Sequence, residues 1–149
     1  MNYLEAGMPT PSVMVADHDL ITMLADISVE HDNLEYINKY APQAEELANR
    51  HDHRLYQAVS HRALGAAHRL NKEYKQAKNR LANAQEIFED MNTDWQLGRT
   101  YYEFGQLSAA QGNSNEAKKH FEQAVQHFKI MGALPDIKRS QSAIDSLTS

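Results

Sequence analysis

The chain has 149 residues, of which 42% are apolar and 23% are charged, and its formal net charge is −5. These values are typical of one globular domain, and they lack the strong basic excess of a nucleic-acid-binding protein. The absence of cysteine excludes a disulfide framework, a thiolate zinc site and a cysteine nucleophile. No apolar run approaches the roughly 18 residues of a membrane span, and residues 1–12 lack the pattern of a signal peptide. We therefore expect a cytoplasmic protein that binds neither nucleic acid nor membrane.

Charge is distributed unevenly along the chain. Residues 1–50 carry nine acidic and two basic side chains, whereas residues 51–149 carry 11 acidic and 13 basic ones. Such a division indicates an asymmetric surface that faces a partner.

Helix is the dominant prediction, because glycine and proline are scarce and apolar residues recur with helical spacing. After a flexible segment at residues 1–16, we expect helices at residues 18–30, 34–50, 54–70, 74–91, 95–111, 115–131 and 136–147. Pro42 is expected to kink or split the second helix. The last helix is polar except for a narrow apolar stripe, so it is predicted to cover the open end of a stack. The fold class is all-α.

The sequence repeats itself with a period of 40 residues. Gly65 and Gly105 are one such pair, and Leu64 corresponds to Phe104 and Leu81 to Phe121. Further identical pairs are Ala77/Ala117, Lys78/Lys118, Ala84/Ala124, Phe88/Phe128 and Met91/Met131. The pattern predicts an array of about three helical hairpins, with units near residues 17–53, 54–93 and 94–134 and a cap at 135–149.

Each unit resembles the tetratricopeptide repeat (TPR). The best unit reads Tyr101-x2-Phe104-Gly105, then Ala117-x3-Phe121 and Ala124; the unit before it has Leu64, Gly65, Ala77, Leu81 and Ala84 at these positions. A TPR unit has about 34 residues, and the longer period is similar to the repeats of the MalT-like and Rap-like bacterial regulators. The resemblance implies a superhelix in which the glycine lets the two helices of a hairpin approach closely. Gly105→Leu is then expected to overpack the contact, and Gly105→Ala to be mild.

The resemblance also implies a concave groove that is lined by the first helix of each hairpin and holds a protein or peptide. The partner-binding residues predicted by register are Arg62, Arg69, Arg99, Tyr102, Gln106 and Arg139, with acidic Asp19 and Asp26 at one end of the groove. Further groove positions are Thr22, Val29, Val59, Ala66, Ala109 and Ser142. The arginines favour a partner with an acidic segment. The carboxylate clamp of chaperone-binding TPRs is absent, because its positions hold Asp19/Met23, Val59/Ala63 and Arg99/Glu103.

We weigh two other interpretations. Eight histidines, including the run His51-Asp52-His53, raise the question of a metal-dependent enzyme, but the sequence has no HExxH pair and no nucleophile or phosphate-loop motif. We therefore predict no metal site, no cofactor and no enzymatic activity. The second alternative is a sensor segment of a larger bacterial regulator. The sequence leaves open whether the chain is complete and whether copies associate through the repeat ends.

Overall fold

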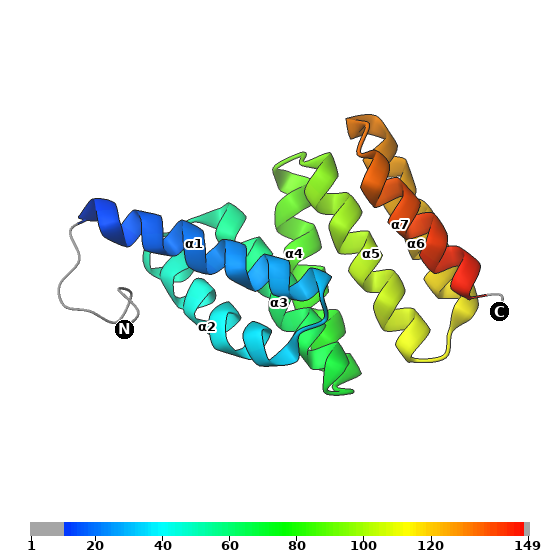
Figure 1. Cartoon of the computed structure of the whole chain (residues 1–149), viewed down its shortest axis with the longest axis horizontal. Helices are drawn as coiled ribbons and strands as arrows, with labels where there is room; N and C mark the ends of the chain where they lie inside the picture. The colour runs from blue at the N-terminus through cyan, green and yellow to red at the C-terminus, as the bar shows by residue number, and fades with distance from the viewer. Residues whose placement is uncertain (1–10, 148–149) are drawn as a thin grey trace.

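The structure is a computed structural model that describes residues 11–147, and every regular element in that range is an α-helix (Figure 1). Side chains are described from residue 17 onward. The helices are α1 (Pro11–Glu30), α2 (Leu34–Arg50), α3 (Arg54–Leu70), α4 (Tyr74–Asp90), α5 (Asp94–Ala110), α6 (Ser114–Met131) and α7 (Leu134–Ser146).

The predicted all-α repeat array is confirmed, with three hairpins followed by a seventh helix. Six helices begin and end within two residues of the predicted bounds. The exception is α1, which begins at Pro11, seven residues earlier than expected. Of the two effects expected of Pro42, a kink or a split of the second helix, the split is wrong, because α2 runs continuously past it to Arg50. Residues 1–10 of the segment predicted to be flexible lie outside the described residues.

The connections explain the 40-residue period. A residue with positive φ follows each of the first six helices at intervals of 20 residues: Asp32, Asp52, Lys72, Asn92, Gly112 and Gly132. The next backbone N–H donates to a carbonyl in the helix that has just ended, as from Asn33 to Ser28 at 3.0 Å and from His53 to Ala48 at 2.9 Å. This bond closes the helix and reverses the chain, and glycine, asparagine and aspartate tolerate the left-handed conformation best. One helix and its connection therefore take 20 residues, and a hairpin takes 40.

The helices fall into two sets. The odd-numbered helices α1, α3 and α5 contact one another in succession, and we call these three and α7 the inner helices. The outer helices α2, α4 and α6 each pack between two inner ones. Figure 1 shows the resulting order, with α1 and α2 at one end of the molecule and α6 and α7 at the other.

The repeat positions predicted from the sequence form the contacts within hairpins. The four alanines predicted at repeat positions of the outer helices are fully buried, namely Ala77, Ala84, Ala117 and Ala124. A Cβ atom built on Gly65 would lie 3.0 Å from the Leu81 side chain, and one built on Gly105 would lie 2.5 Å from Cε1 of Phe121. Gly105 therefore touches a ring that is almost completely buried, and the glycine is required for close approach rather than for its backbone freedom.

This contact corrects the expectation that Gly105→Ala is mild. We expect Gly105→Ala to lower the free energy of unfolding by about 1–3 kcal/mol, since an added methyl group must displace the buried Phe121 ring. Chemical denaturation measures the loss. Phe121→Leu in the same chain should recover part of it, because leucine has no ring at that position. Unchanged stability of Gly105→Ala would contradict the packing described for α5 and α6.

Candidate partner-binding site

The predicted groove arginines meet a carboxylate from the first hairpin. Asp26 of α1 accepts a hydrogen bond from Nη2 of Arg62 at 3.1 Å and another from Nη1 of Arg99. Arg62 belongs to α3 and Arg99 to α5, so this single carboxylate joins three inner helices. The side chain of Arg62 is fully buried, and that of Arg99 is 7% exposed.

Arg62 has further partners besides Asp26. Its Nη1 donates to the carbonyl of Gln96 at 3.1 Å and to Oγ1 of Thr100 at 3.4 Å, and its guanidinium lies 5.2 Å from the centre of the Phe88 ring. Burial, reinforced by the charge of Arg99, lowers the pKa of Arg62 to about 10, so the side chain keeps its positive charge at neutral pH. Burial opposes ionisation of Asp26, but Arg62 and Arg99 outweigh it and hold the pKa of Asp26 below its ordinary value.

A second set of charges continues the pairing along the same face. Arg69 contacts Asp32 at 2.6 Å and Glu103 at 3.6 Å, and Arg99 contacts Glu30 at 3.5 Å. Glu103 is buried, and this burial raises its pKa although the guanidinium of Arg69 opposes the shift. We refer to Asp26, Glu30, Asp32, Arg62, Arg69, Arg99 and Glu103 together as the ionic cluster.

The ionic cluster corrects the expectation of a basic groove open to a partner. Arg62, Arg69 and Arg99 share one face, as the register predicted, but each is paired with carboxylates of the same chain. The sequence contains the signal, because Asp26 stands at a groove position and Glu103 at a position of the carboxylate clamp. Register alone places Asp26 at the acidic end of the groove and the arginines at the basic end, and it does not show that the superhelix brings the two together.

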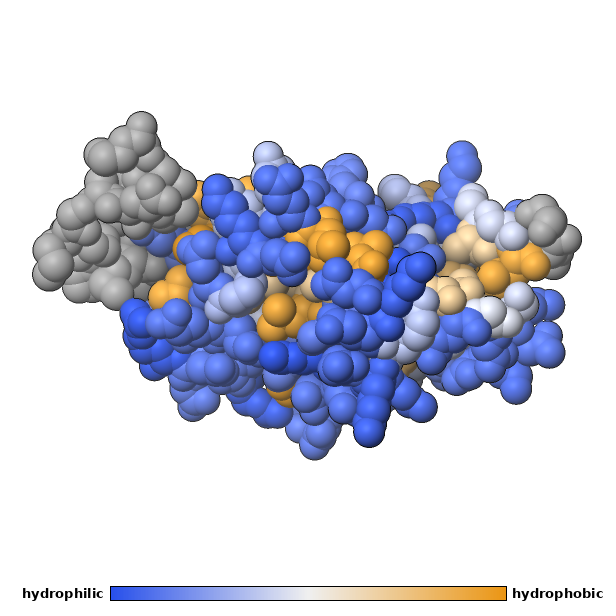
Figure 2. All heavy atoms as spheres, turned by 90° about the horizontal axis from the view of Figure 1, so that it is seen from below, coloured by the Kyte–Doolittle hydropathy of each residue, from blue (hydrophilic) through white to orange (hydrophobic). Residues whose placement is uncertain are grey.

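The other three predicted residues come together in a hollow between α5, α6 and α7. Tyr102, Gln106 and Arg139 line it, and its volume is about 600 Å³. The guanidinium of Arg139 lies 4.4 Å from the centre of the Tyr102 ring, and Gln106 donates to the Tyr102 hydroxyl at 3.4 Å. The remaining lining residues are Ala109, Phe121, Ser142, Ala143, Ser146 and Leu147. Figure 2 shows hydrophobic atoms at the end of the molecule where α7 finishes.

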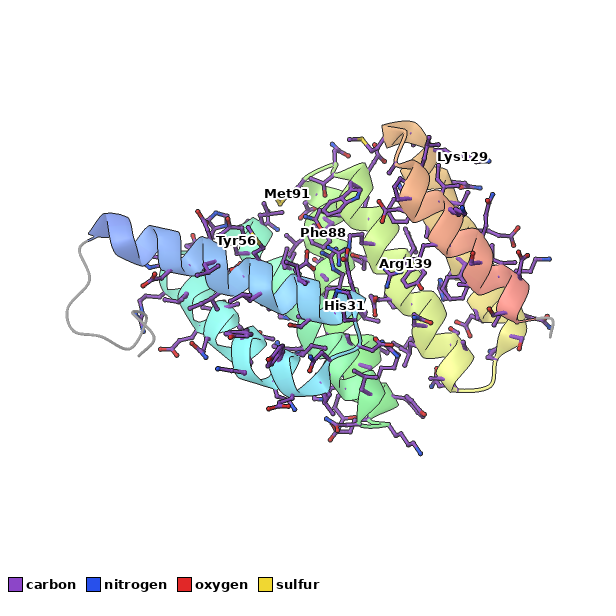
Figure 3. The ribbon with its side chains drawn as sticks, viewed as in Figure 1. His31, Tyr56, Phe88, Met91, Lys129 and Arg139 are labelled. Carbon is purple, nitrogen blue, oxygen red and sulfur yellow. The ribbon has the colours of Figure 1, made fainter. Side chains whose placement is uncertain are left out.

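Arg139 links this hollow to the ionic cluster. Its Nη2 donates to the main-chain carbonyl of Glu30 at 3.3 Å, at the end of α1. In Figure 3 the Arg139 side chain lies toward the end of α1, where His31 is labelled. Whereas the arginines of the ionic cluster face carboxylates, Arg139 is held by a carbonyl and a ring, and it is only half-buried. Its charge is therefore the one most accessible from the hollow among the four predicted arginines.

The histidines pack against aromatic and charged neighbours. The ring of His18 lies 5.8 Å from that of His51, 5.7 Å from that of His53 and 4.7 Å from that of Tyr56, measured between centroids. Elsewhere, His61 contacts Nη1 of Arg80 at 3.0 Å. In residues 11–147, no group of three or more histidine, aspartate or glutamate side chains has the arrangement of a metal site.

Stacked two-helix units of constant length define the molecule as a helical repeat protein. The family model of the tetratricopeptide repeat matches residues 55–130, which is half of the chain. The chain therefore belongs to the tetratricopeptide repeat family, whose members generally mediate protein–protein interactions and are typically non-enzymatic scaffolds. No curated protein sequence matches it significantly. Among the described residues, no helix combines the length and hydrophobicity needed to cross a membrane.

Removal of the Asp26 charge should destabilise the fold strongly. Asp26→Asn leaves the buried guanidinium groups of Arg62 and Arg99 undercompensated, which we expect to cost about 3–5 kcal/mol in the free energy of unfolding. Asp90→Asn is the matched control, because Asp90 pairs with Arg54 at 3.3 Å where both side chains are more than half exposed. That change should cost less than about 1 kcal/mol. Equal losses in chemical denaturation would show that Asp26 has no special role.

Stability should fall on mild acidification. Burial and the charges of His53 and His51 lower the pKa of His18, although Asp19 opposes the shift. Burial and Arg80 likewise lower the pKa of His61, against the effect of Glu45. Below the ordinary value of 6.5, the unfolded chain then binds more protons than the folded one, so the free energy of unfolding decreases as pH falls.

The measurement is the melting temperature between pH 7 and pH 5. The wild type should melt at progressively lower temperature across this interval, and the double variant His18→Gln, His61→Gln should show a flatter dependence. A double variant with the wild-type slope would assign the pH dependence to other groups.

Proposed function

We propose that the chain is a non-enzymatic binding module that holds a segment of a partner protein in the hollow between α5, α6 and α7. The observation that supports this best is the convergence of Tyr102, Gln106 and Arg139, each from a groove position, around one hollow of about 600 Å³. Ala109 and Ser142, which also stand at groove positions, line the same hollow. Three helices thus contribute to one concave surface of mixed polarity, as is usual for ligand sites.

The chemistry of the hollow favours a segment with a carboxylate next to an apolar side chain. Arg139 offers a planar set of N–H donors that can bind a carboxylate through two parallel hydrogen bonds. The aromatic face of Tyr102 already orients the guanidinium, so little conformational entropy remains to be lost on binding. Ala109, Ala143 and Leu147 provide apolar surface for the neighbouring residue of the partner.

Peptides selected on the folded chain test this proposal. A displayed library of 12-residue peptides is panned against the wild type, and the selected peptides are then measured by calorimetry. They should contain aspartate or glutamate beside an aromatic or aliphatic residue. Arg139→Glu should weaken their binding by about tenfold or more, because hydrogen bonds to charged groups contribute about 1.5–3 kcal/mol.

The control is Lys138→Glu, which makes a similar charge change at an exposed neighbour on the same helix. It should leave the affinity within about twofold, as mutation of an exposed charge changes binding little. Circular dichroism should show both variants to be folded. Peptides that bind Arg139→Glu as tightly as the wild type would place the binding surface outside the hollow.

A further inference from the structure

An apolar stripe on α1 is left uncovered by the other helices that the structure describes. Leu20 is 36% exposed, Met23 is 56% exposed and Ile27 is 45% exposed. Their spacing of three and four residues places them on one face of the helix. We call these three residues the α1 stripe. Scattered apolar residues on a surface need no explanation, but a continuous row on one helix face does.

The 40-residue period shows what this face does in the other inner helices. The positions that correspond to the α1 stripe are Ser60, Ala63 and Ala67 in α3, and Thr100, Glu103 and Leu107 in α5. All six residues are at most 5% exposed. The same face is therefore buried in the second and third hairpins and open in the first.

An outer helix covers this face wherever it is buried. Helix α2 packs on α3, and Ile37 and Ala41 of α2 share a core cluster with Ala63 and Ala67 of α3. Helix α4 packs on α5, where Leu81 shares a cluster with Leu107. The α1 stripe thus has the position and the polarity of a surface that receives an amphipathic helix.

The two ends of the array differ in this respect. At the opposite end, α7 exposes polar side chains along its length, such as Lys138, Gln141 and Ser142, as expected of a helix that terminates a stack, and its exposed Leu134 is a single residue at the start of the helix. The α1 stripe, in contrast, presents larger apolar side chains than the corresponding positions of α3. A terminating helix would not gain from them.

Charge indicates the chemistry of the occupant. Helix α1 contains no lysine or arginine, and two exposed carboxylates stand on the edge of the α1 stripe nearest Met23. They are Asp19, which accepts a hydrogen bond from the Tyr56 hydroxyl, and Glu30, which also pairs with Arg99. A second copy of α1 packed about a twofold axis would bring these acidic edges together, which is unfavourable. A helix with lysine or arginine beside its apolar residues would instead be attracted to this acidic edge.

We propose that the α1 stripe is a docking surface for an amphipathic helix of a partner protein, with apolar residues at intervals of three and four and basic residues at their edges. The docked helix lies on α1 as α2 lies on α3, and it extends the array by one outer helix. This surface is separate from the hollow between α5, α6 and α7, so either proposal stands or falls without the other.

A synthetic peptide with the sequence of residues 113–132 is a suitable probe. It reproduces α6, which presents Phe121, Ala124 and Phe128 on one face and also carries Lys118, Lys119 and Lys129. Labelled peptide is titrated with the full chain and followed by fluorescence anisotropy. We expect saturable one-to-one binding that weakens with added salt. A peptide with the three lysines changed to glutamate should bind at least about tenfold more weakly.

Ile27→Glu and Met23→Glu test the surface itself. Each should weaken binding at least about tenfold, and each should leave the melting temperature near that of the wild type because both side chains are largely exposed. Ile130→Glu is the matched control, since Ile130 is 68% exposed at the other end of the array, and it should bind the peptide as the wild type does.

Three kinds of result would overturn the proposal. The first is a peptide titration that does not depend on the α1 stripe, because the peptide either fails to bind or loses as much affinity in Ile130→Glu as in Ile27→Glu. The second is sedimentation of the wild type as a dimer that Ile27→Glu converts to a monomer, which would make a second copy the occupant. The third is binding only after removal of residues 1–10, which would assign the surface to the chain's own N-terminal segment.

Discussion

The arrangement of the inner helices depends on the carboxylate of Asp26. In a repeat array each hairpin normally contacts only its neighbours, so small changes at each junction add up along the stack. Asp26 is an exception, because it binds Arg62 of the second hairpin and Arg99 of the third. Arg139 adds a bond from α7 to the end of α1. These contacts fix the relation of the first hairpin to elements 36 to 109 residues further along the chain, and they connect α1 to α3, α5 and α7.

Burying such charges costs desolvation free energy, which ion pairing seldom offsets in full. Their main effect is therefore to select one arrangement of the helices rather than to stabilise the fold. Arg62 cannot leave Asp26 without exposing the Phe88 ring and the carbonyl of Gln96 that it also contacts. A superhelix of different curvature would separate these partners. The part of the inner surface around Asp26 is thus occupied by the chain's own side chains. Both surfaces that we propose for partners, the hollow beside Arg139 and the α1 stripe, lie outside the ionic cluster.

The sequence predicted the fold closely because its strongest signals are local. Each of these signals depends on contacts within one hairpin. They are the small residues Gly105 and Ala117, the aromatic residues opposite them and the turn residues at intervals of 20. The same register placed Tyr102, Gln106 and Arg139 on the surface where the hollow lies. Exposure was harder to predict, because burial of Arg62 depends on how the hairpins curve around Asp26. Helical periodicity describes one helix at a time and says nothing of that curvature.

The early start of α1 is also difficult to predict from the sequence, since Pro11 is compatible with a first helical turn as well as with a flexible segment.

Charge balance within the ionic cluster determines which charges remain on the outer surface of the molecule. The arginines of α3 and α5 are neutralised by carboxylates of α1, α5 and the turn after α1, so they add little to the external field. The exposed carboxylates of the first hairpin that lie outside the ionic cluster, Asp19, Glu35 and Glu46, still give this end of the molecule an acidic surface. At the opposite end, Arg139 keeps a cation at the edge of the hollow. The two surfaces differ in charge as well as in shape, and this difference is the reason why we propose different occupants for them: a basic amphipathic helix at α1 and an acidic peptide at α7.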